Sequence, residues 1–266
     1  MSGVVVILPV MPEPNLHELL AVATEAAYVA GRRTLSYFNT GVAVDIKQDD
    51  TPVTIADREA EQIVRSILAK YFPSHTIVGE EQGESAGDPD YKWYVDPIDG
   101  TKSFIHGIPL YSVLIGCEIR GRVDVGVIYL PALDEMIAAA HGLGCSWNGR
   151  RAKVSSTDTL QQAMLLCTDL RMARDRSGAY DRLEKITKLQ RCAYDAYGYA
   201  LVATGRADVI IDPVMNDWDC GPLPVIFREA GGRFSNWKGE ETIHGGDAVA
   251  TNGRLHHDTL KILQEP

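Results

Sequence analysis

Two aspartates three residues apart, Asp96 and Asp99, follow a short apolar run that is typical of a buried strand. Carboxylate oxygens presented together at a strand end can bind a divalent cation. Pro97 stiffens the backbone between them, and Gly100 lets the main chain approach a ligand closely. A helix opening at 101–104 would point free N–H groups at the same place, where they suit a phosphate. The stretch predicts a metal and phosphate site, although a polar turn with an aspartate helix cap uses the same dipeptides.

Other acids stand at the ends of predicted elements. Asp57 falls in the first turn of a helix capped by Thr54, and Glu80 follows a glycine at the end of a short strand. Asp212 ends an apolar strand, and Asp219 lies near the start of a helix. Each position also has a structural explanation: a favourable helix dipole for Asp57, ordinary exposure for Glu80 and a cap for Asp219. Taken singly, these acids leave both interpretations open.

The elements that must position these acids mix helices and strands without strict alternation. Apolar periodicity and capping residues predict helices at 15–38, 54–71, 101–104, 180–188, 194–205, 223–230 and 256–263. Apolar and alternating runs predict strands at 42–47, 76–78, 93–95, 136–140, 163–167, 209–212, 233–234 and 248–250, with a hairpin over 111–129. This mixture favours layered α+β architecture over a doubly wound parallel sheet. We expect one domain at 15–263, with halves at about 15–150 and 151–263 after an extension at 1–14.

Composition narrows the class of protein. The chain has 266 residues and a formal charge of -10, from 36 acids and 26 bases, which disfavours nonspecific binding to nucleic acid. The sequence has no run of about 18 apolar residues, so we expect no membrane span. The five cysteines are widely spaced, with no C-x-x-C pair. We interpret them as reduced thiols of a cytoplasmic protein.

Four motifs occur together in one order along the chain. They are K-Q-D-D-T-P-V-T-I-A-D at 47–57, G-E-E at 79–81, W-Y-V-D-P-I-D-G-T at 93–101, and W-D at 218–219 followed by A-G-G at 230–232. In this order they resemble the inositol monophosphatase superfamily of magnesium-dependent phosphatases, over nearly all of residues 15–263. The resemblance implies an αβαβα sandwich, a site for two or three Mg²⁺ ions with Mn²⁺ as a possible substitute, and a homodimer.

The same resemblance implies roles for individual residues. Glu80, Asp96 and the carbonyl of Ile98 would bind one metal, and Asp96, Asp99 and Asp219 a second. Asp57 and Thr101, with Glu80 beside them, would orient and deprotonate the attacking water. The amides of Gly100 and Thr101 would bind phosphate, with Lys102 as a further substrate contact. Hard oxygen ligands of this kind suit Mg²⁺ better than zinc.

The second half most resembles the histidinol-phosphate phosphatase branch of the superfamily. R-C-A-Y-D-A-Y-G-Y-A-L at 191–201 is similar to that branch's helix entry, and F-S-N-W-K-G at 234–239 departs from its pattern at two positions. Histidinol phosphate carries a cationic amine, which Asp195, Asp212 and Asp217 could attract. Asp219 is a further expected substrate contact. Arg191 would hold phosphate or orient Asp195. Arg191 and Asp195 could instead form only a salt bridge and a helix cap, and the role of Asp217 stays open.

Other functions remain possible at this stage. An inositol monophosphatase or a broad sugar-phosphate phosphatase would use the same mechanism. A 3'-phosphoadenosine 5'-phosphate phosphatase is less favoured, because the sequence shows no basic patch for a second phosphate. A metal or phosphosugar sensor without catalytic activity would be expected to lack a water-activating pair or a metal ligand. We therefore expect a small phosphomonoester as the partner, with neither nucleic acid nor membrane.

Overall fold

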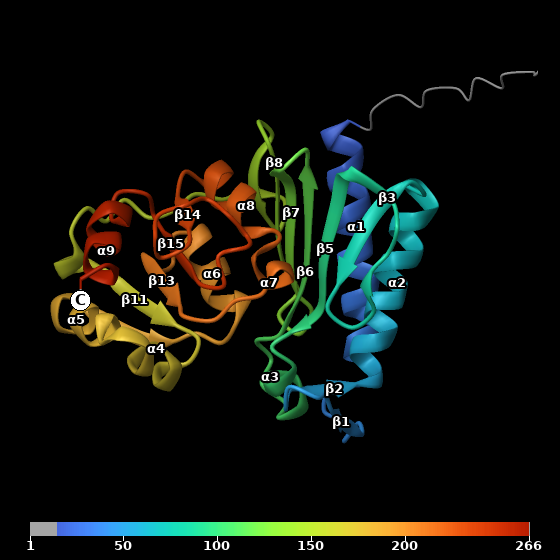
Figure 1. Ribbon diagram of the computed structural model, residues 1–266, viewed down its shortest axis with the longest axis horizontal. Coiled ribbons are helices and arrows are strands. Elements are labelled where there is room, and N and C mark those ends of the chain that lie inside the picture. The colour runs from blue at the N-terminus through green and yellow to red at the C-terminus, as the bar shows by residue number, and fades with distance from the viewer. Residues whose placement is uncertain (1–14, 266) are drawn as a thin grey trace, which may run out of the picture.

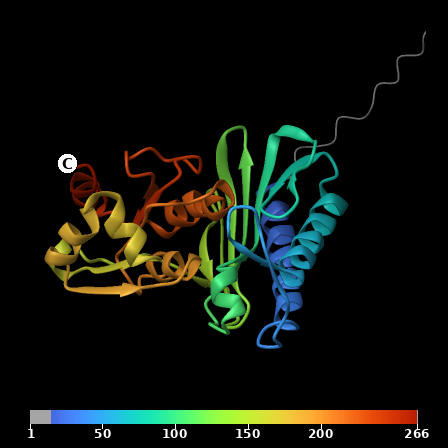
Figure 2. The ribbon, with the colours of Figure 1, turned by 60° about the horizontal axis from the view of Figure 1, so that its bottom comes forward.

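The computed structural model describes residues 15–265, and the predicted extension at 1–14 lies outside the described residues. The chain forms five layers in the order helix, sheet, helix, sheet, helix, which Figures 1 and 2 show from two directions. The layered αβαβα type of α+β fold predicted from the sequence is therefore confirmed. Within the described residues, no helix has the length and apolar character needed to cross a bilayer.

The first half of the chain forms the outer helix layer and an eight-stranded sheet. The strand order is β10-β9-β8-β7-β6-β5-β3-β4, and the β3–β5 pair is parallel within it. The helices are α1 (Leu16–Leu35), α2 (Ile55–Tyr71) and α3 (Thr101–Ile105). The sheet strands are β3 (His75–Gly79), β4 (Gly83–Glu84), β5 (Asp88–Asp99), β6 (Ser112–Ile119), β7 (Arg122–Leu130), β8 (Glu135–Ala140), β9 (Gly144–Trp147) and β10 (Arg150–Arg151). A separate two-stranded sheet joins β1 (Val44–Ile46) to β2 (Pro52–Thr54).

The second half supplies the other sheet and the remaining helices. Its five strands have the order β12-β11-β13-β15-β14. They are β11 (Met164–Cys167), β12 (Leu189–Cys192), β13 (Val209–Asp212), β14 (Arg233–Ser235) and β15 (Ala248–Thr251). The helices are α4 (Leu170–Ser177), α5 (Ala179–Ile186), α6 (Ala196–Ala203), α7 (Asp217–Cys220), α8 (Leu223–Ala230) and α9 (His256–Leu263), with a 3-10 turn at Leu160–Gln162. α6 and α8 pack between the two sheets, and α5 and α9 cover the far face.

Local sequence explains why these elements form where they do. α1 begins after Asn15, whose side chain accepts a hydrogen bond of 2.8 Å from the N–H of Glu18. The buried face of α1 is rich in alanine, which lets the helix lie close to the sheet. α6 is apolar nearly all round, as expected for a helix enclosed between two sheets.

A close backbone contact holds the second half against the first. A Cβ atom added to Gly116, in β6, would lie 2.2 Å from the carbonyl carbon and oxygen of Gly221. Gly221 directly follows α7, the short helix that carries Asp219. The two glycines therefore allow α7 to rest on the first sheet near β5 and β6.

Several elements differ from the sequence prediction. No strand was predicted between the strand at 42–47 and the helix at 54–71, but Pro52–Thr54 form β2, which pairs with β1. α4 and β12 were not predicted, because α4 is short and strongly charged and β12 is a largely exposed edge strand without an apolar run. Helix and strand ends elsewhere moved by a few residues, as α1 shows by ending at Leu35 rather than near residue 38.

The Gly116 contact gives a stability prediction. Gly116→Ala should lower the free energy of unfolding by about 3 kcal/mol, because the new methyl group meets main-chain atoms that cannot move aside easily. The variant should also bind Mg²⁺ more weakly, since α7 would be displaced. Urea unfolding and calorimetric titration with Mg²⁺ measure the two effects.

The matched change is Gly121→Ala, in the turn between β6 and β7. Nothing lies within 4 Å of a Cβ at Gly121, where φ is +80°. This control should cost only the strain of a left-handed backbone, about 1 kcal/mol, and leave Mg²⁺ binding unchanged. Equal effects of the two substitutions would contradict the proposed role of the Gly116 contact.

Candidate active site

A bulge in β5 turns Asp96 and Asp99 to the same side of the sheet. β5 pairs with β6 in register as far as Asp96 and Leu114, and pairing resumes at Asp99 and Ser112. In a regular strand, residues three apart face opposite sides, and the extra residue of the bulge cancels this difference. The strand was expected to end before Asp96, but it runs through the bulge to Asp99.

Asp219 joins these two aspartates from the other half of the chain. One carboxylate oxygen from each of Asp96, Asp99 and Asp219 lies within 4.8 Å of the other two. Asp96 is 3% exposed and Asp99 9% exposed. Asp219 also accepts a hydrogen bond of 2.7 Å from the N–H of Asn216 as part of a capping box. The cap and the carboxylate cluster are therefore two uses of one side chain.

Glu80 lies beside this cluster, at the end of β3. Its negative charge contributes to the raised pKa of Asp96, after the larger effect of burial. The ammonium of Lys47 lies 2.8 Å from Glu80 and 2.6 Å from Glu81. The chain thus places its own cation against the two glutamates, next to the three aspartates.

Burial and the crowding of like charges act together on the carboxyl groups. Burial is the largest cause in each case: it raises the pKa of Asp96 and of Asp99 well above the usual range. Burial, with repulsion from Glu80, raises the pKa of Asp219 to about 6. Ionising all of these acids at once costs much free energy unless positive charge lies between them. The donor set of oxygen atoms therefore fits Mg²⁺ or Mn²⁺.

Asp57 and Thr101 come together from α2 and α3. The hydroxyl of Thr101 lies 3.1 Å from Oδ1 of Asp57 and 3.1 Å from the carbonyl oxygen of Ile98. Asp57 is fully buried, and its other oxygen accepts from the N–H and the hydroxyl of Thr54. Asp57 is therefore both the first-turn acid expected from the sequence, in a helix capped by Thr54, and a partner of Thr101.

Gly100 and Asp195 meet where the two halves face each other. Gly100 has a φ of +88°, and a Cβ on it would lie 2.5 Å from a carboxylate oxygen of Asp195. Asp195 itself has a φ of +52°, a strained conformation of the kind that accumulates at functional sites. It makes no helix-cap hydrogen bond, so its interpretation as a simple cap is wrong. Gly100, Asp195 and Lys102 line one cavity. Burial raises the pKa of Asp195, and the positive charge of Lys102 lowers it by a smaller amount.

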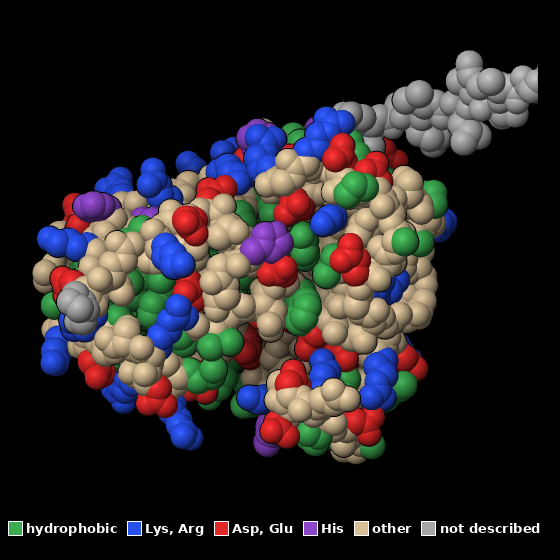
Figure 3. All heavy atoms as spheres, viewed as in Figure 1, with side chains coloured by type: hydrophobic (Ala, Val, Ile, Leu, Met, Phe, Trp, Pro, Cys, Tyr) green, Lys and Arg blue, Asp and Glu red, His purple; other side chains and the backbone are tan. Residues whose placement is uncertain are grey.

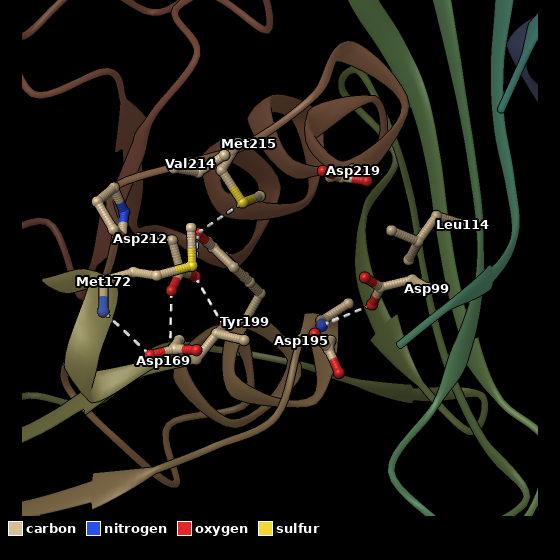
Figure 4. A pocket seen from close by; sticks show the side chains of 13 residues that line it. Asp99, Leu114, Asp169, Met172, Asp195, Tyr199, Asp212, Val214, Met215 and Asp219 are labelled. Atoms are coloured by element: carbon tan, nitrogen blue, oxygen red, sulfur yellow. Dashed lines mark hydrogen bonds between the residues drawn. The ribbon is translucent and has the colours of Figure 1, made fainter. Parts of the chain in front are cut away.

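A pocket opens beside the carboxylate cluster, between the two halves (Figure 4). Figure 3 shows the surface hollowed between the halves, with acidic side chains recessed there. Asp212 lies within the pocket wall, where it accepts hydrogen bonds from the N–H of Thr168 at 2.9 Å and from the hydroxyl of Tyr199 at 2.9 Å. Burial raises the pKa of Asp212 to about 7. The residues that line the pocket are Asp99, Leu114, Thr168, Asp169, Met172, Asp195, Ala196, Tyr199, Asp212, Pro213, Val214, Met215 and Asp219.

Arg191 is a sequence-predicted site residue that the structure places away from the pocket and the carboxylate cluster. It lies on the edge strand β12, is exposed, and donates a hydrogen bond of 2.7 Å to the adjacent carbonyl of Gln190. Among the described residues no ion pair joins it to Asp195, whose side chain instead accepts a hydrogen bond of 3.4 Å from the hydroxyl of Ser103. Its predicted contact with phosphate or with Asp195 is therefore not supported, because a strand rather than a helix entry carries it.

Sequence reasoning missed the residues that hold the acids in place. Ser112 and the N–H of Ala196 donate to one oxygen of Asp99 at 2.9 and 2.7 Å. Glu61 is fully buried and accepts the N–H of Glu81 at 2.7 Å, which fixes the loop after β3. The position of Glu61 on the apolar face of the predicted helix could have indicated that its charge is buried and has a structural role. The partners of Asp99 come from distant segments and left no local pattern.

Hydrolysis of a phosphate ester needs positive charge near the phosphoryl oxygens and a group that takes a proton from water. The carboxylate cluster can hold the positive charge, and the pair formed by Asp57 and Thr101 can take the proton; Thr101 lines the same cavity as the cluster, with Asp57 buried behind it. This arrangement places the chain in the class of metal-dependent phosphatases. The family model described as the inositol monophosphatase family matches residues 15–265. The chain belongs to this family of metal-dependent phosphoric monoester hydrolases.

Individual relatives agree with this assignment. A histidinol-phosphatase from Chlorobaculum parvum is 39% identical over 92% of this chain and 96% of its own length. A histidinol-phosphatase from Mycobacterium tuberculosis is 38% identical over 93% of this chain and 98% of its own. The structure of an inositol monophosphatase from Anabaena superposes with a TM-score of 0.83 at 34% identity, covering 95% of this chain and 98% of that one.

The raised pKa values predict how the metal-free enzyme responds to pH. The pKa of Asp212 rises from 3.8 to about 7 and that of Asp219 from 3.8 to about 6. Between the usual pKa of 3.8 and the raised pKa of each group, the folded protein holds a proton that the unfolded chain has released. The free energy of unfolding therefore falls as pH rises through this range. Each group contributes up to about 1.4 kcal/mol per pH unit within its window. In EDTA, the melting temperature should fall from pH 5 to pH 7.5. Adding Mg²⁺ should raise the melting temperature more at pH 7.5 than at pH 5.

The control for this prediction is Asp212→Asn, which keeps the shape of the side chain but releases no proton. It should weaken the pH dependence in EDTA, most of all between pH 6 and 7.5, because Asp219 still titrates, and it should leave the response to Mg²⁺ in place. Differential scanning calorimetry measures both. A metal-free enzyme that becomes more stable from pH 5 to pH 7.5 would show that these acids are not strained by burial.

Proposed function

We propose that this enzyme is a Mg²⁺-dependent histidinol-phosphate phosphatase. The observation that carries the choice of substrate is the pocket beside the carboxylate cluster. Five aspartates line it, Asp99, Asp169, Asp195, Asp212 and Asp219, and no lysine or arginine does so among the described residues. Such a pocket attracts a substrate with a positive charge near its phosphate. Two of the relatives, both matched over nearly their whole lengths, have names that agree with this substrate.

The donor set assigns metal ligands by chemistry and proximity. We infer that Asp96, Asp99 and Asp219 hold one Mg²⁺, and that Glu80, Asp96 and the carbonyl of Ile98 hold another. Ions bound in this way supply neutralising charge for the phosphoryl oxygens and an acidified water. Lys47 would be displaced from Glu80 or share it, because Glu80 is the ligand that already has a cationic partner.

Thr101 and Asp57 handle the proton of the attacking water in this proposal. The hydroxyl of Thr101 has one hydrogen, which favours the charged acceptor Asp57 over the carbonyl of Ile98. Its oxygen lone pairs then stay available to accept a hydrogen bond from water. As the water attacks the phosphorus, its proton can pass to Thr101 while Asp57 takes the hydroxyl hydrogen. Burial raises the pKa of Asp57, which makes it a stronger base when ionised.

The start of α3 is the proposed phosphate contact. The N–H groups of Gly100 and Thr101 lie at the helix start, and Lys102 lines the cavity beside them. Asp195, Asp212 and Asp219 would face the amine of the substrate. Asp212 would act mainly through Thr168 and Tyr199, since its oxygens already accept their hydrogen bonds.

Inositol monophosphatase activity is the second candidate, because the Anabaena structure shares the fold and 34% identity. An uncharged polyol would gain hydrogen bonds from the aspartates but no charge pairing. A substrate with two phosphates fits poorly, since no basic side chain lines the pocket among the described residues. A sensor without catalytic activity is also disfavoured, because it would be expected to lack a metal ligand or the water-activating pair. This chain has the proposed metal ligands and the pair formed by Asp57 and Thr101. We also propose a homodimer, on the family resemblance alone.

Removing one metal ligand should abolish most turnover. Asp96→Asn should lower kcat by more than about 100-fold, because Asp96 is proposed to bind both ions. The variant should also show weaker Mg²⁺ binding by calorimetry. The wild-type enzyme should lose activity in excess EDTA and regain it when Mg²⁺ is added.

Asp90→Asn is the matched control, because Asp90 lies on the same strand with its side chain 56% exposed. It should keep wild-type activity and Mg²⁺ affinity. Full activity of the wild-type enzyme in EDTA, or near-normal kcat of Asp96→Asn, would refute the metal assignment.

A substrate comparison tests the specificity. In the presence of Mg²⁺, kcat/KM for histidinol phosphate should exceed that for inositol 1-phosphate and adenosine 3',5'-bisphosphate by at least about tenfold, since the acid-lined pocket pairs only with the amine. Release of inorganic phosphate reports all three reactions. If histidinol phosphate ranks last, the proposed substrate is wrong and the phosphatase class remains.

A further inference from the structure

The acid-lined pocket has an apolar outer wall that the phosphatase chemistry does not use. Met172, on α4, is 44% exposed, and Val214, after β13, is 59% exposed. Both line the pocket, together with Met215. The side chains of Met172 and Met215 extend into the same part of the pocket, above Tyr199 (Figure 4). Large apolar side chains left in water at the mouth of a polar cavity gain free energy when a ligand covers them.

The two ends of the pocket suit different parts of one ligand. The inner end, at Asp195 and Asp219, attracts the ammonium group next to the phosphate. The outer end offers thioether and aliphatic groups, which pack well on the face of an aromatic ring. Histidinol phosphate has this order of groups: phosphate ester, then ammonium, then imidazole. This reasoning rests on the proposed function and extends it to the far end of the substrate.

We propose that the imidazole ring of the substrate lies between Met172 and the segment 213–215, and that Arg176 positions this segment. Met172 and Val214 are then specificity-determining residues. Arg176 touches no substrate and acts through the segment it holds. None of these three residues is needed for the attack of water on phosphate.

The contacts of Arg176 support its positioning role. Its guanidinium donates to the carbonyl of Pro213 and to the carboxylate of Asp247, and it lies 4.4 Å from the centre of the Trp237 ring. Asp247 is 6% exposed and also accepts the N–H of Trp237 at 2.7 Å. The segment is held a second time by the N–H of Met215, which donates to the carbonyl of Gly246 at 3.0 Å.

α4 connects the two walls of the proposed ring site. Met172 and Arg176 are four residues apart and so lie on one face of the helix. Met172 reaches into the pocket from the same helix that binds Pro213 through Arg176. The Arg176 contacts therefore fix the distance between Met172 and the segment 213–215.

A truncated substrate isolates the ring. Histidinol phosphate without its imidazolylmethyl group is 2-aminoethyl phosphate, which keeps the phosphate and the amine. Met172→Ser and Val214→Ser should each lower kcat/KM for histidinol phosphate by about tenfold, mainly through KM, because apolar contact with the ring is lost. Neither variant should change kcat/KM for 2-aminoethyl phosphate, or its inhibition constant against histidinol phosphate if its turnover is slow. Leu143→Ser, at another exposed apolar residue in a remote turn, should change neither substrate.

Arg176→Lys tests the positioning role. Lysine keeps a charge beside Asp247 but lacks the planar fork that binds Asp247 and Pro213 together. KM for histidinol phosphate should rise several-fold while kcat and the kinetics of 2-aminoethyl phosphate stay unchanged. The double variant Arg176→Lys, Val214→Ser should discriminate between the two substrates no worse than Val214→Ser alone, because both changes act on the same contact.

The outcomes separate this inference from the function on which it rests. A wild-type enzyme that does not hydrolyse histidinol phosphate overturns both. A wild-type enzyme that prefers histidinol phosphate, with Met172→Ser and Val214→Ser keeping its full preference over 2-aminoethyl phosphate, overturns the ring site alone. Equal losses on both substrates also overturn it, since they show a general effect on the fold. Additive effects in the double variant overturn the role of Arg176.

Discussion

Repulsion among buried carboxylates is the constraint around which this structure is organised. Asp96, Asp99 and Asp219 share a space in which one oxygen of each lies within 4.8 Å of the others. An arrangement of this kind costs free energy in the absence of cations, so the rest of the fold must hold the acids in place. The bulge in β5 holds two of them, and the glycine contact between β6 and the end of α7 holds the third. Packing in the surrounding layers thus offsets the repulsion among these carboxylates, and a bound cation would relieve that repulsion.

The first half of the site was predictable because its signals are local. Asp57, Glu80, Asp96 and Asp99 each follow a strand or begin a helix, and strand ends on one side of a sheet meet in space. Thr54 marked the start of α2, and the structure confirms this cap and shows that it forms a capping box with Asp57. The order of the four motifs then supplied the link to Asp219, more than 100 residues further along the chain. Spacing alone could not have made this link, because nothing in a local pattern states which distant segments pack together.

The parts that were not predicted depend on tertiary contacts. α4 is short and charged, with little apolar pattern of its own, and it is held by Arg176 against Asp247 and Trp237. The bulge in β5 follows from pairing with β6, which the sequence of β5 does not reveal. Arg191 was misplaced for a related reason: its neighbours resemble a helix entry, but pairing with β11 makes residues 189–192 an edge strand. In each case a contact between segments overrode the local preference.

The two halves divide the work of the enzyme in a way that the layered fold permits. Every residue proposed for water activation and phosphate binding, from Asp57 to Lys102, comes from the first half, where the bulge and α3 fix them rigidly. The walls of the pocket come mainly from the second half, on α4, α6 and the segment after β13, which can vary without disturbing the bulge. Asp219 is the exception, because it belongs to the carboxylate cluster but is carried by the second half. Its helix begins at Asp217, just after the segment 213–215, so the wall proposed to select the substrate and the third acid of the cluster are neighbours in the chain. The N–H of Asn216, the residue directly after this segment, donates a hydrogen bond of 2.7 Å to Asp219, so a shift of the segment would reach the carboxylate cluster unless this cap is kept.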